Sequence, residues 1–273
     1  MGSYKIVASD LDGTLLLEDM TVSAENTLAI IQMAQKGVQF VPASGRTLCE
    51  MPEDILHHPD IRYYIYSNGA AIWDKQTDTH THLCMPKQVA NFVLDTLSKY
   101  ACHVTVRQGG QSYADAFAHS DAEYSYYQIC QPHHDVLEAH ATFMEDFSQF
   151  TYALDNVESF AVFFHDDNDL EPCRLFLQQN EELSVALSFP HCIEIFSAHG
   201  GKGCALRCLA DMLHTPIQQT IAVGDSGNDL AMIKTAGLGL ATSNAYDILK
   251  NAASAVICSN QEHIAAYILK EYL

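Results

Sequence analysis

The residues best suited to chemistry lie in a short acidic segment near the start of the chain. Asp10 and Asp12 follow an apolar run at residues 4–9, which predicts a buried strand, and Gly13 then makes a turn. Two carboxylates at this spacing can face one pocket, where they repel each other unless a cation or a shared proton lies between them. A hard divalent ion such as Mg²⁺ would leave one carboxylate as nucleophile and the other as acid and base. The alternative is an Asx turn that merely ends the strand.

A second acidic segment follows the apolar run at residues 220–223. It contains Asp225 and Asp229 and precedes a helical pattern at residues 230–236. Because the carboxyl ends of parallel strands share one edge of a sheet, these acids are predicted to join the first pair. Four clustered carboxylates are costly unless they bind a metal. By itself the segment fits a set of helix N-caps equally well. The presence of the first acidic pair favours metal binding over capping.

Two further segments suit phosphate binding. Residues 44–46 (Ser-Gly-Arg) follow a second apolar run and offer a hydroxyl and backbone amides near a helix start. Lys202 lies between two glycines, where its ammonium can approach a phosphate unobstructed. Alone, Ser44 also fits an ordinary serine in a turn, and Lys202 also fits an ordinary exposed lysine. Thr47 and Glu50 predict a capping box that opens one short helix ending before Pro59.

Short apolar runs alternate with helical patterns at both ends of the chain, as a parallel sheet with crossover helices requires. The middle of the chain has longer helical stretches, including one predicted at residues 134–147, and strands joined by hairpins. We therefore predict an α/β fold with a Rossmann-like parallel-sheet core over residues 1–76 and 196–273. An inserted α/β domain is predicted over residues 77–195.

Together these segments resemble the haloacid-dehalogenase-like (HAD) superfamily, and more narrowly its Cof-type phosphatases. The resemblance spans essentially the whole chain. The matching motifs are Asp10 to Leu15, Ser44 to Arg46, Asn68 to Ala70, Lys202 with Gly203, and Gly224 to Asp229. The resemblance implies that the inserted domain is a cap that closes over the site and selects the substrate.

The resemblance also implies the roles of the acidic residues. Asp10 would be the nucleophile that forms an aspartyl-phosphate, and Asp12 would protonate the leaving oxygen and then activate water. Mg²⁺ would be held by the Asp10 carboxylate, the Asp12 main-chain carbonyl and Asp225, with Asp229 in support. The implied activity is a Mg²⁺-dependent phosphohydrolase of a small phosphorylated metabolite, with sugar phosphates as one candidate class.

The phosphoryl oxygens would, by the same resemblance, be held by Ser44, Lys202, Asn228 and the Leu11 amide. Arg107, in the inserted domain, is a candidate for substrate recognition. The chain departs from the family near its end, because residues 260–264 lack the Asp-Gly pair usual there.

Composition excludes several kinds of partner. Lys and Arg number 14 against 34 Asp and Glu, for a net charge of −20, which would repel nucleic acid and anionic membrane surfaces. No apolar run reaches the roughly 18 residues of a membrane helix, and no basic segment precedes an apolar signal core. Nine cysteines without a CxxC pair indicate reduced thiols. We therefore expect a cytoplasmic enzyme with no nucleic-acid or membrane partner, whose oligomeric state the sequence leaves open.

Two alternatives remain at this point. A sugar phosphomutase would use the same aspartyl-phosphate but would need water excluded from the intermediate. A non-enzymatic protein that binds a phosphorylated metabolite would need no acid and base, so the presence of Asp12 argues against it.

Overall fold

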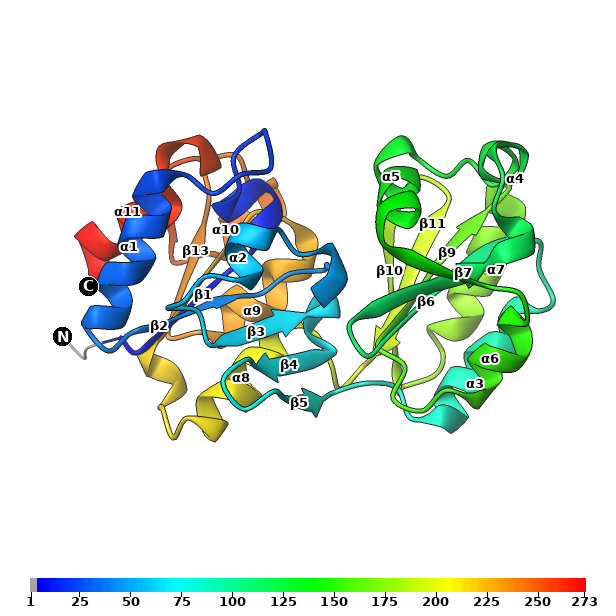
Figure 1. Ribbon diagram of the computed structural model, residues 1–273, viewed down its shortest axis with the longest axis horizontal. Coiled ribbons are helices and arrows are strands. Elements are labelled where there is room, and N and C mark those ends of the chain that lie inside the picture. The colour runs from blue at the N-terminus through cyan, green and yellow to red at the C-terminus, as the bar shows by residue number, and fades with distance from the viewer. Residues whose placement is uncertain (1–3) are drawn as a thin grey trace. The chain divides into compact units, whose positions relative to one another are not determined.

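The computed structural model describes residues 4–273, apart from the side chains of residues 132, 188 and 189. The chain divides into two compact units (Figure 1). Unit 1 comprises the described part of Met1–Arg46, with Met51–Thr81 and Gly200–Leu273. Unit 2 comprises Thr47–Glu50 and His82–His199. The units therefore divide after Thr81 and after His199, whereas the sequence predicted limits after residues 76 and 195.

Unit 1 is built on a five-stranded parallel sheet. Its strands, in spatial order, are β14 (Ala255–Val256), β13 (Leu238–Ala241), β12 (Thr220–Gly224), β1 (Ile6–Ser9) and β2 (Gln39–Pro42). From β1 the chain proceeds to β2 on one side, whereas β12, β13 and β14 extend the other side. The strand order therefore reverses between β1 and β12, which is the place where open α/β sheets bind ligands.

Helices cover this sheet, since all four residues of β1 are buried although side chains alternate between the two faces. The helices of unit 1 are α1 (Ala24–Gln35), α2 (Glu53–Leu56), α8 (Lys202–Met212), α9 (Leu230–Thr235), α10 (Asp247–Ala252) and α11 (Ile264–Tyr272). Helix α1 packs against α11, and α8 packs against α9 (Figure 1). The predicted α/β class with a parallel core sheet is confirmed.

The single helix predicted after Thr47 is wrong. The structure has a 3₁₀ helix at Leu48–Glu50 and a separate α2, with Pro52 at the N-cap of α2. Proline lacks an N–H and disfavours helical backbone in the residue before it, so it divides the segment. The Glu50 carboxylate does accept a hydrogen bond from the Thr47 N–H, at 2.9 Å.

A small sheet completes unit 1. It consists of β3 (Tyr63–Tyr66), β4 (Ala71–Asp74) and β5 (Thr79–His82) in that order. The turn between β3 and β4 holds Asn68 in the left-handed region, with φ +55°. Asparagine tolerates this backbone better than most residues, which explains its place in the turn.

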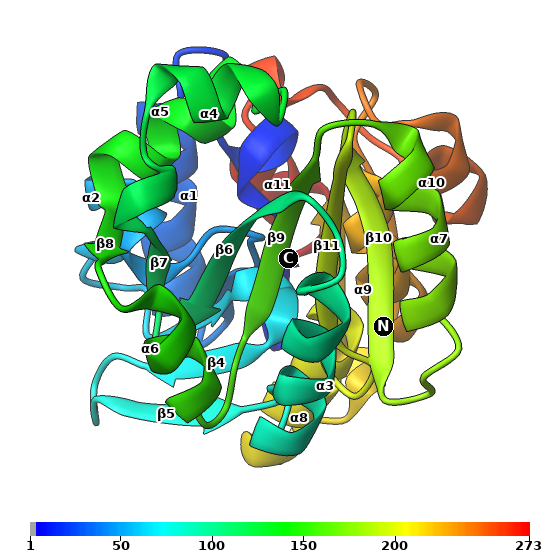
Figure 2. The ribbon, with the colours of Figure 1, turned by 90° about the vertical axis from the view of Figure 1, so that its right-hand side faces the viewer.

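Unit 2 contains a six-stranded sheet. The strands, in spatial order, are β10 (Leu183–Phe189), β11 (Cys192–Ser197), β9 (Ser159–Phe164), β6 (Cys102–Gln108), β7 (Gln111–Asp115) and β8 (Ala141–Met144). Figure 2 shows α3 (Lys87–Leu97) and α7 (Asp167–Leu177) on one face of this sheet, where they enclose its hydrophobic core. Three shorter helices are α4 (Asp121–Tyr126), α5 (Gln131–His140) and α6 (Phe147–Ala153).

The helix predicted at residues 134–147 is also wrong. Helix α5 ends at His140, and β8 pairs in parallel with β7 directly afterwards. The segment Ala-Thr-Phe-Met has no strong local preference, so its pairing partner in the sheet decides its conformation.

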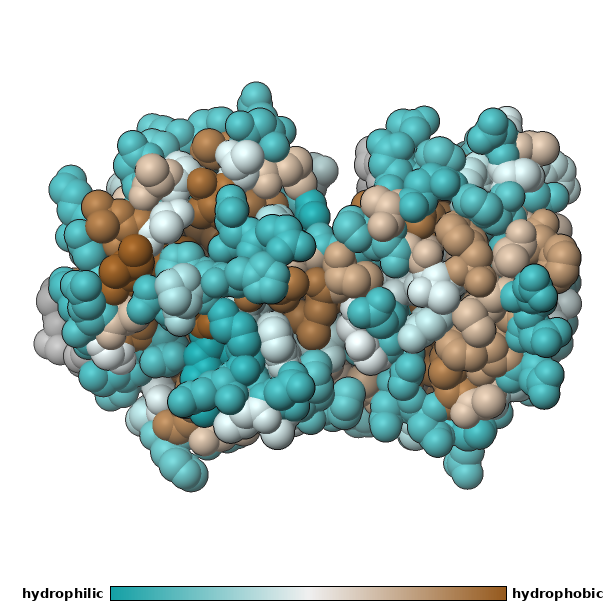
Figure 3. Space-filling view, viewed as in Figure 1, coloured by the Kyte–Doolittle hydropathy of each residue, from teal (hydrophilic) through white to brown (hydrophobic). Residues whose placement is uncertain are grey.

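No helix among the described residues is both long and apolar enough to cross a membrane. Hydrophilic residues are spread over the visible surface of both units, with hydrophobic residues between them (Figure 3).

Candidate active site

The ends of β1 and β12 bring the two acidic segments together. Ser9 pairs with Val223, and the Asp10 N–H donates to the Val223 carbonyl at 3.0 Å. Beyond Asp10 the chain turns at Gly13, whose φ is +74° and whose missing Cβ would collide with the Asp225 carboxylate. Glycine therefore permits both the turn and the close approach to Asp225.

Lys202 lies at the centre of the site. It is the first residue of α8, and its Nζ lies 2.5 Å from Asp10 Oδ1 and 2.7 Å from Asp229 Oδ1. All three side chains are buried. Burial lowers the pKa of Lys202, but the charges of Asp10 and Asp229 outweigh it and leave that pKa above its usual value. Lys202 is thus a buried cation and not an exposed surface lysine.

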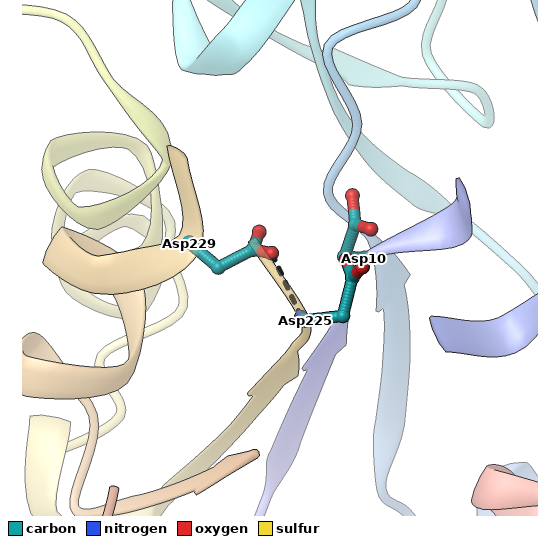
Figure 4. A group of neighbouring side chains, drawn as sticks. All are labelled: Asp10, Asp225 and Asp229. Atoms are coloured by element: carbon teal, nitrogen blue, oxygen red, sulfur yellow. Dashed lines mark hydrogen bonds between the residues drawn. The ribbon is translucent and has the colours of Figure 1, made fainter. Parts of the chain in front are cut away.

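Asp229 connects Lys202 to the start of α9. Its Oδ2 accepts hydrogen bonds from the N–H groups of Asp225 and Ser226, each at 3.1 Å. Asp229 therefore caps the turn that precedes the helix while its other oxygen binds Lys202. Figure 4 shows the three carboxylates, which come from the end of β1, the end of β12 and the segment before α9.

The three carboxylates fit a divalent cation. One oxygen from each of Asp10, Asp225 and Asp229 lies within 4.8 Å of the others. Asp225 Oδ1 is buried and has no hydrogen-bond partner. Burial, with the nearby Asp229 charge, raises the pKa of Asp10 well above its usual range and that of Asp225 to about 6. Three carboxylates face the single ammonium of Lys202, so an oxygen-seeking cation would offset the remaining negative charge.

Asp12 lies in a different environment from Asp10. Its side chain is 47% exposed, and its carboxylate is bound at two points by the guanidinium of Arg46, with Nε–Oδ2 at 2.9 Å and Nη2–Oδ1 at 2.7 Å. The Asp12 charge contributes to the raised pKa of Asp225, so the carboxylate is still electrostatically linked to the acidic group. The sequence motif contained Arg46, but the sequence analysis gave it no role.

The predicted phosphate-binding residues lie in neighbouring loops of unit 1. Ser44 is buried, and its Oγ accepts a hydrogen bond from the Arg46 N–H at 3.1 Å. Asn228 is exposed and donates to Asn68 Oδ1 at 2.9 Å. Asn68 also donates its own N–H to the Ser44 carbonyl at 3.0 Å, so it connects these two loops. Leu11, whose amide was predicted to bind phosphate, directly follows Asp10 and has a buried side chain.

Asparagine side chains brace the loop that carries Asp10 and Asp12. Its carbonyl oxygens accept hydrogen bonds from Asn244 (to Gly13, 2.7 Å), Asn260 (to Leu16, 2.9 Å) and Asn26 (to Leu15, 3.2 Å). These contacts join segments more than ten residues apart in sequence, and sequence reasoning did not identify them.

Arg107 was the sequence candidate for substrate recognition in the inserted domain. In unit 2 it is buried, and its Nη1 pairs with Glu194 Oε1 at 3.3 Å. Its charge is therefore compensated within unit 2.

The fold and the acidic site define a haloacid dehalogenase-like hydrolase. The sequence pattern of this family matches residues 7–269, and the chain belongs to it. Phosphatase YwpJ of Bacillus subtilis (strain 168) is 30% identical over 289 residues, covering 98% of this chain and 100% of that protein. The 5-amino-6-(5-phospho-D-ribitylamino)uracil phosphatase YwtE of the same organism is 30% identical over 282 residues, with 98% of each chain covered.

A solved structure supports the same family. A haloacid dehalogenase-like hydrolase from B. subtilis superposes with a TM-score of 0.81 at 28% identity, covering 98% of this chain and 100% of the other. The family and the phosphatase class predicted from the sequence are confirmed.

Proposed function

We propose that this protein is a Mg²⁺-dependent phosphohydrolase that cleaves a small phosphorylated metabolite through an aspartyl-phosphate on Asp10. The observation that carries the proposal is the buried Asp10 carboxylate, which lies at the sheet's reversal point 2.5 Å from Lys202. Beside it, Asp225 has a buried oxygen without a partner. A nucleophilic carboxylate, a fixed cation and a set of oxygen donors that can hold a metal ion suit phosphoryl transfer, which depends mainly on positioning and charge stabilisation.

The reaction we propose has two steps. In the first, an Asp10 carboxylate oxygen bonds to phosphorus while the bond from phosphorus to the leaving oxygen breaks, and Asp12 gives that oxygen a proton. In the second, Asp12 takes a proton from a water molecule as the water oxygen bonds to phosphorus, and the bond between phosphorus and Asp10 breaks. The products are the alcohol, inorganic phosphate and the original two carboxyl groups.

In this proposal the phosphoryl oxygens are bound by Lys202, Ser44, Asn228 and the Leu11 N–H. The ion is held by the Asp10 carboxylate, the Asp12 main-chain carbonyl and Asp225. Asp229 supports the site by fixing Lys202 and the turn that begins at Asp225. When bound, Mg²⁺ supplies charge neutralisation for the transferring group.

The inserted domain is proposed to select the substrate. Relatives of this chain are named for a phosphorylated ribityl compound and for HMP-PP, so small metabolites of these kinds are the first candidates, together with sugar phosphates.

The first test is hydrolysis of p-nitrophenyl phosphate with Mg²⁺ and with EDTA, comparing the native chain with Asp10→Asn. A panel of phosphorylated metabolites, including the compounds named above, follows. The proposal expects Mg²⁺-dependent release of phosphate that Asp10→Asn abolishes. Turnover that survives in Asp10→Asn would contradict it, and isomerisation of a sugar phosphate without release of phosphate would indicate a mutase.

A further inference from the structure

We infer that Arg46 is a positioning residue, which holds the Asp12 carboxylate in place for proton transfer at the leaving oxygen. The inference rests on the proposed function, because Asp12 is the acid and base of that reaction. It assigns to Arg46 no direct contact with the reacting atoms.

The contact between the two side chains has the geometry of a clamp. Arg46 Nε lies 2.9 Å from Asp12 Oδ2, and Nη2 lies 2.7 Å from Oδ1. Two parallel hydrogen bonds from a planar guanidinium fix both the position and the plane of the carboxylate. A single contact would leave the carboxylate free to rotate.

The guanidinium is itself held by a fixed backbone. The Arg46 N–H donates to Ser44 Oγ at 3.1 Å, and the Arg46 carbonyl accepts from the Ser67 N–H at 2.8 Å. The clamp therefore extends from the same loop that offers Ser44 for phosphate binding. Through it, the position of the acid–base group is tied to the position of a phosphate-binding residue.

A purely structural role does not account for the pair. The Arg46 and Asp12 side chains are 25% and 47% exposed, so water screens both charges and the pair adds only modestly to stability even with its two hydrogen bonds. The position of an acid–base group, in contrast, strongly affects rate, because proton transfer requires close and aligned atoms.

The chain supplies a matched control in the same unit. Arg62, directly before β3, binds Asp74, at the end of β4, through the same two atoms, Nε at 2.9 Å and Nη2 at 2.7 Å. This pair has the same chemistry but includes none of the proposed catalytic or phosphate-binding residues. Arg62→Lys therefore reports the effect of weakening such a pair away from the site.

The test compares kcat/KM for two substrates in Arg46→Lys, Arg46→Gln, Arg62→Lys and Asp12→Asn. p-Nitrophenyl phosphate has a leaving group that departs without a proton, whereas a sugar monophosphate hydrolysed by the native chain needs the proton from Asp12. We expect Arg46→Lys and Arg46→Gln to lower kcat/KM for the sugar phosphate about tenfold or more, and for the aryl phosphate about threefold or less. Arg62→Lys should leave the ratio of the two values unchanged.

A double variant shows whether Arg46 acts through Asp12. In Asp12→Asn the substitution Arg46→Lys should cause no additional selective loss for the sugar phosphate. Equal losses for both substrates, or a selective loss that persists in the Asp12→Asn background, would overturn the assignment of Arg46 alone. A native chain that hydrolyses neither substrate would instead overturn the proposed function, and this inference with it.

Discussion

The charge of Asp225 is unfavourable where no cation balances it, so removing that charge should stabilise the protein in EDTA. Burial first, and then the Asp229 charge, raises its pKa to about 6 from an ordinary 3.8. The folded chain therefore holds this proton more tightly than the unfolded chain, so stability falls as the pH rises from about 4 to about 6. The difference of about two pH units corresponds to about 3 kcal/mol, and solvent screening at this partly exposed side chain reduces the expected cost to about 1–2 kcal/mol.

The perturbation is Asp225→Asn, which keeps the shape of the side chain and removes the charge. In EDTA at about pH 7.5, the free energy of unfolding measured in urea should exceed that of the native chain by about 1–2 kcal/mol. At about pH 4 the difference should largely vanish. Added Mg²⁺ should stabilise the native chain and have little effect on the variant, because the variant lacks one of the proposed ligands.

Asp211→Asn serves as the control, since Asp211 is exposed on α8 and belongs to the same unit. It should change neither the pH dependence nor the effect of Mg²⁺. If Asp225→Asn destabilised the metal-free protein at neutral pH, or if Mg²⁺ stabilised it as much as the native chain, the reasoning about this site would be refuted.

Two further variants test the same geometry. Lys202→Met leaves the buried Asp10 and Asp229 without their cation. It should lower the free energy of unfolding in urea by about 3 kcal/mol or more at neutral pH and abolish phosphatase activity. An active variant of native stability would contradict this. Gly13→Ala places a methyl group against the Asp225 carboxylate at a φ of +74°. It should destabilise the chain by about 1–3 kcal/mol and raise the Mg²⁺ concentration needed for half-maximal rate. An unchanged Mg²⁺ requirement would count against the proposed contact.

The sequence was informative wherever a motif ended a strand. Asp10 and Asp225 could be assigned to one sheet edge because apolar runs precede both, and parallel strands end at a common edge. The order of strands, with β1 beside β12, was not contained in those runs, yet it is what brings the two carboxylates together.

Contacts between distant loops could not be predicted in this way. The pair of Arg46 with Asp12 depends on where two loops meet, and a single sequence records no such proximity. The same holds for Asn244, which braces the Gly13 carbonyl from a segment more than two hundred residues away. The interruption at Pro52 was different, because proline lacks the N–H that a continuous helix needs and the sequence alone could have predicted the break.

The central claim is that Asp10 carries the phosphoryl group during turnover. The most direct measurement is mass spectrometry of acid-quenched Asp12→Asn protein after incubation with Mg²⁺ and p-nitrophenyl phosphate. The leaving group of this substrate needs no proton from Asp12, so the intermediate still forms, and loss of the proposed base should slow its hydrolysis. We predict a phosphoryl adduct on the peptide that contains Asp10, and none in the Asp10→Asn variant. An adduct on another residue, or phosphate release by the native chain with no adduct trapped under any quench, would contradict the account.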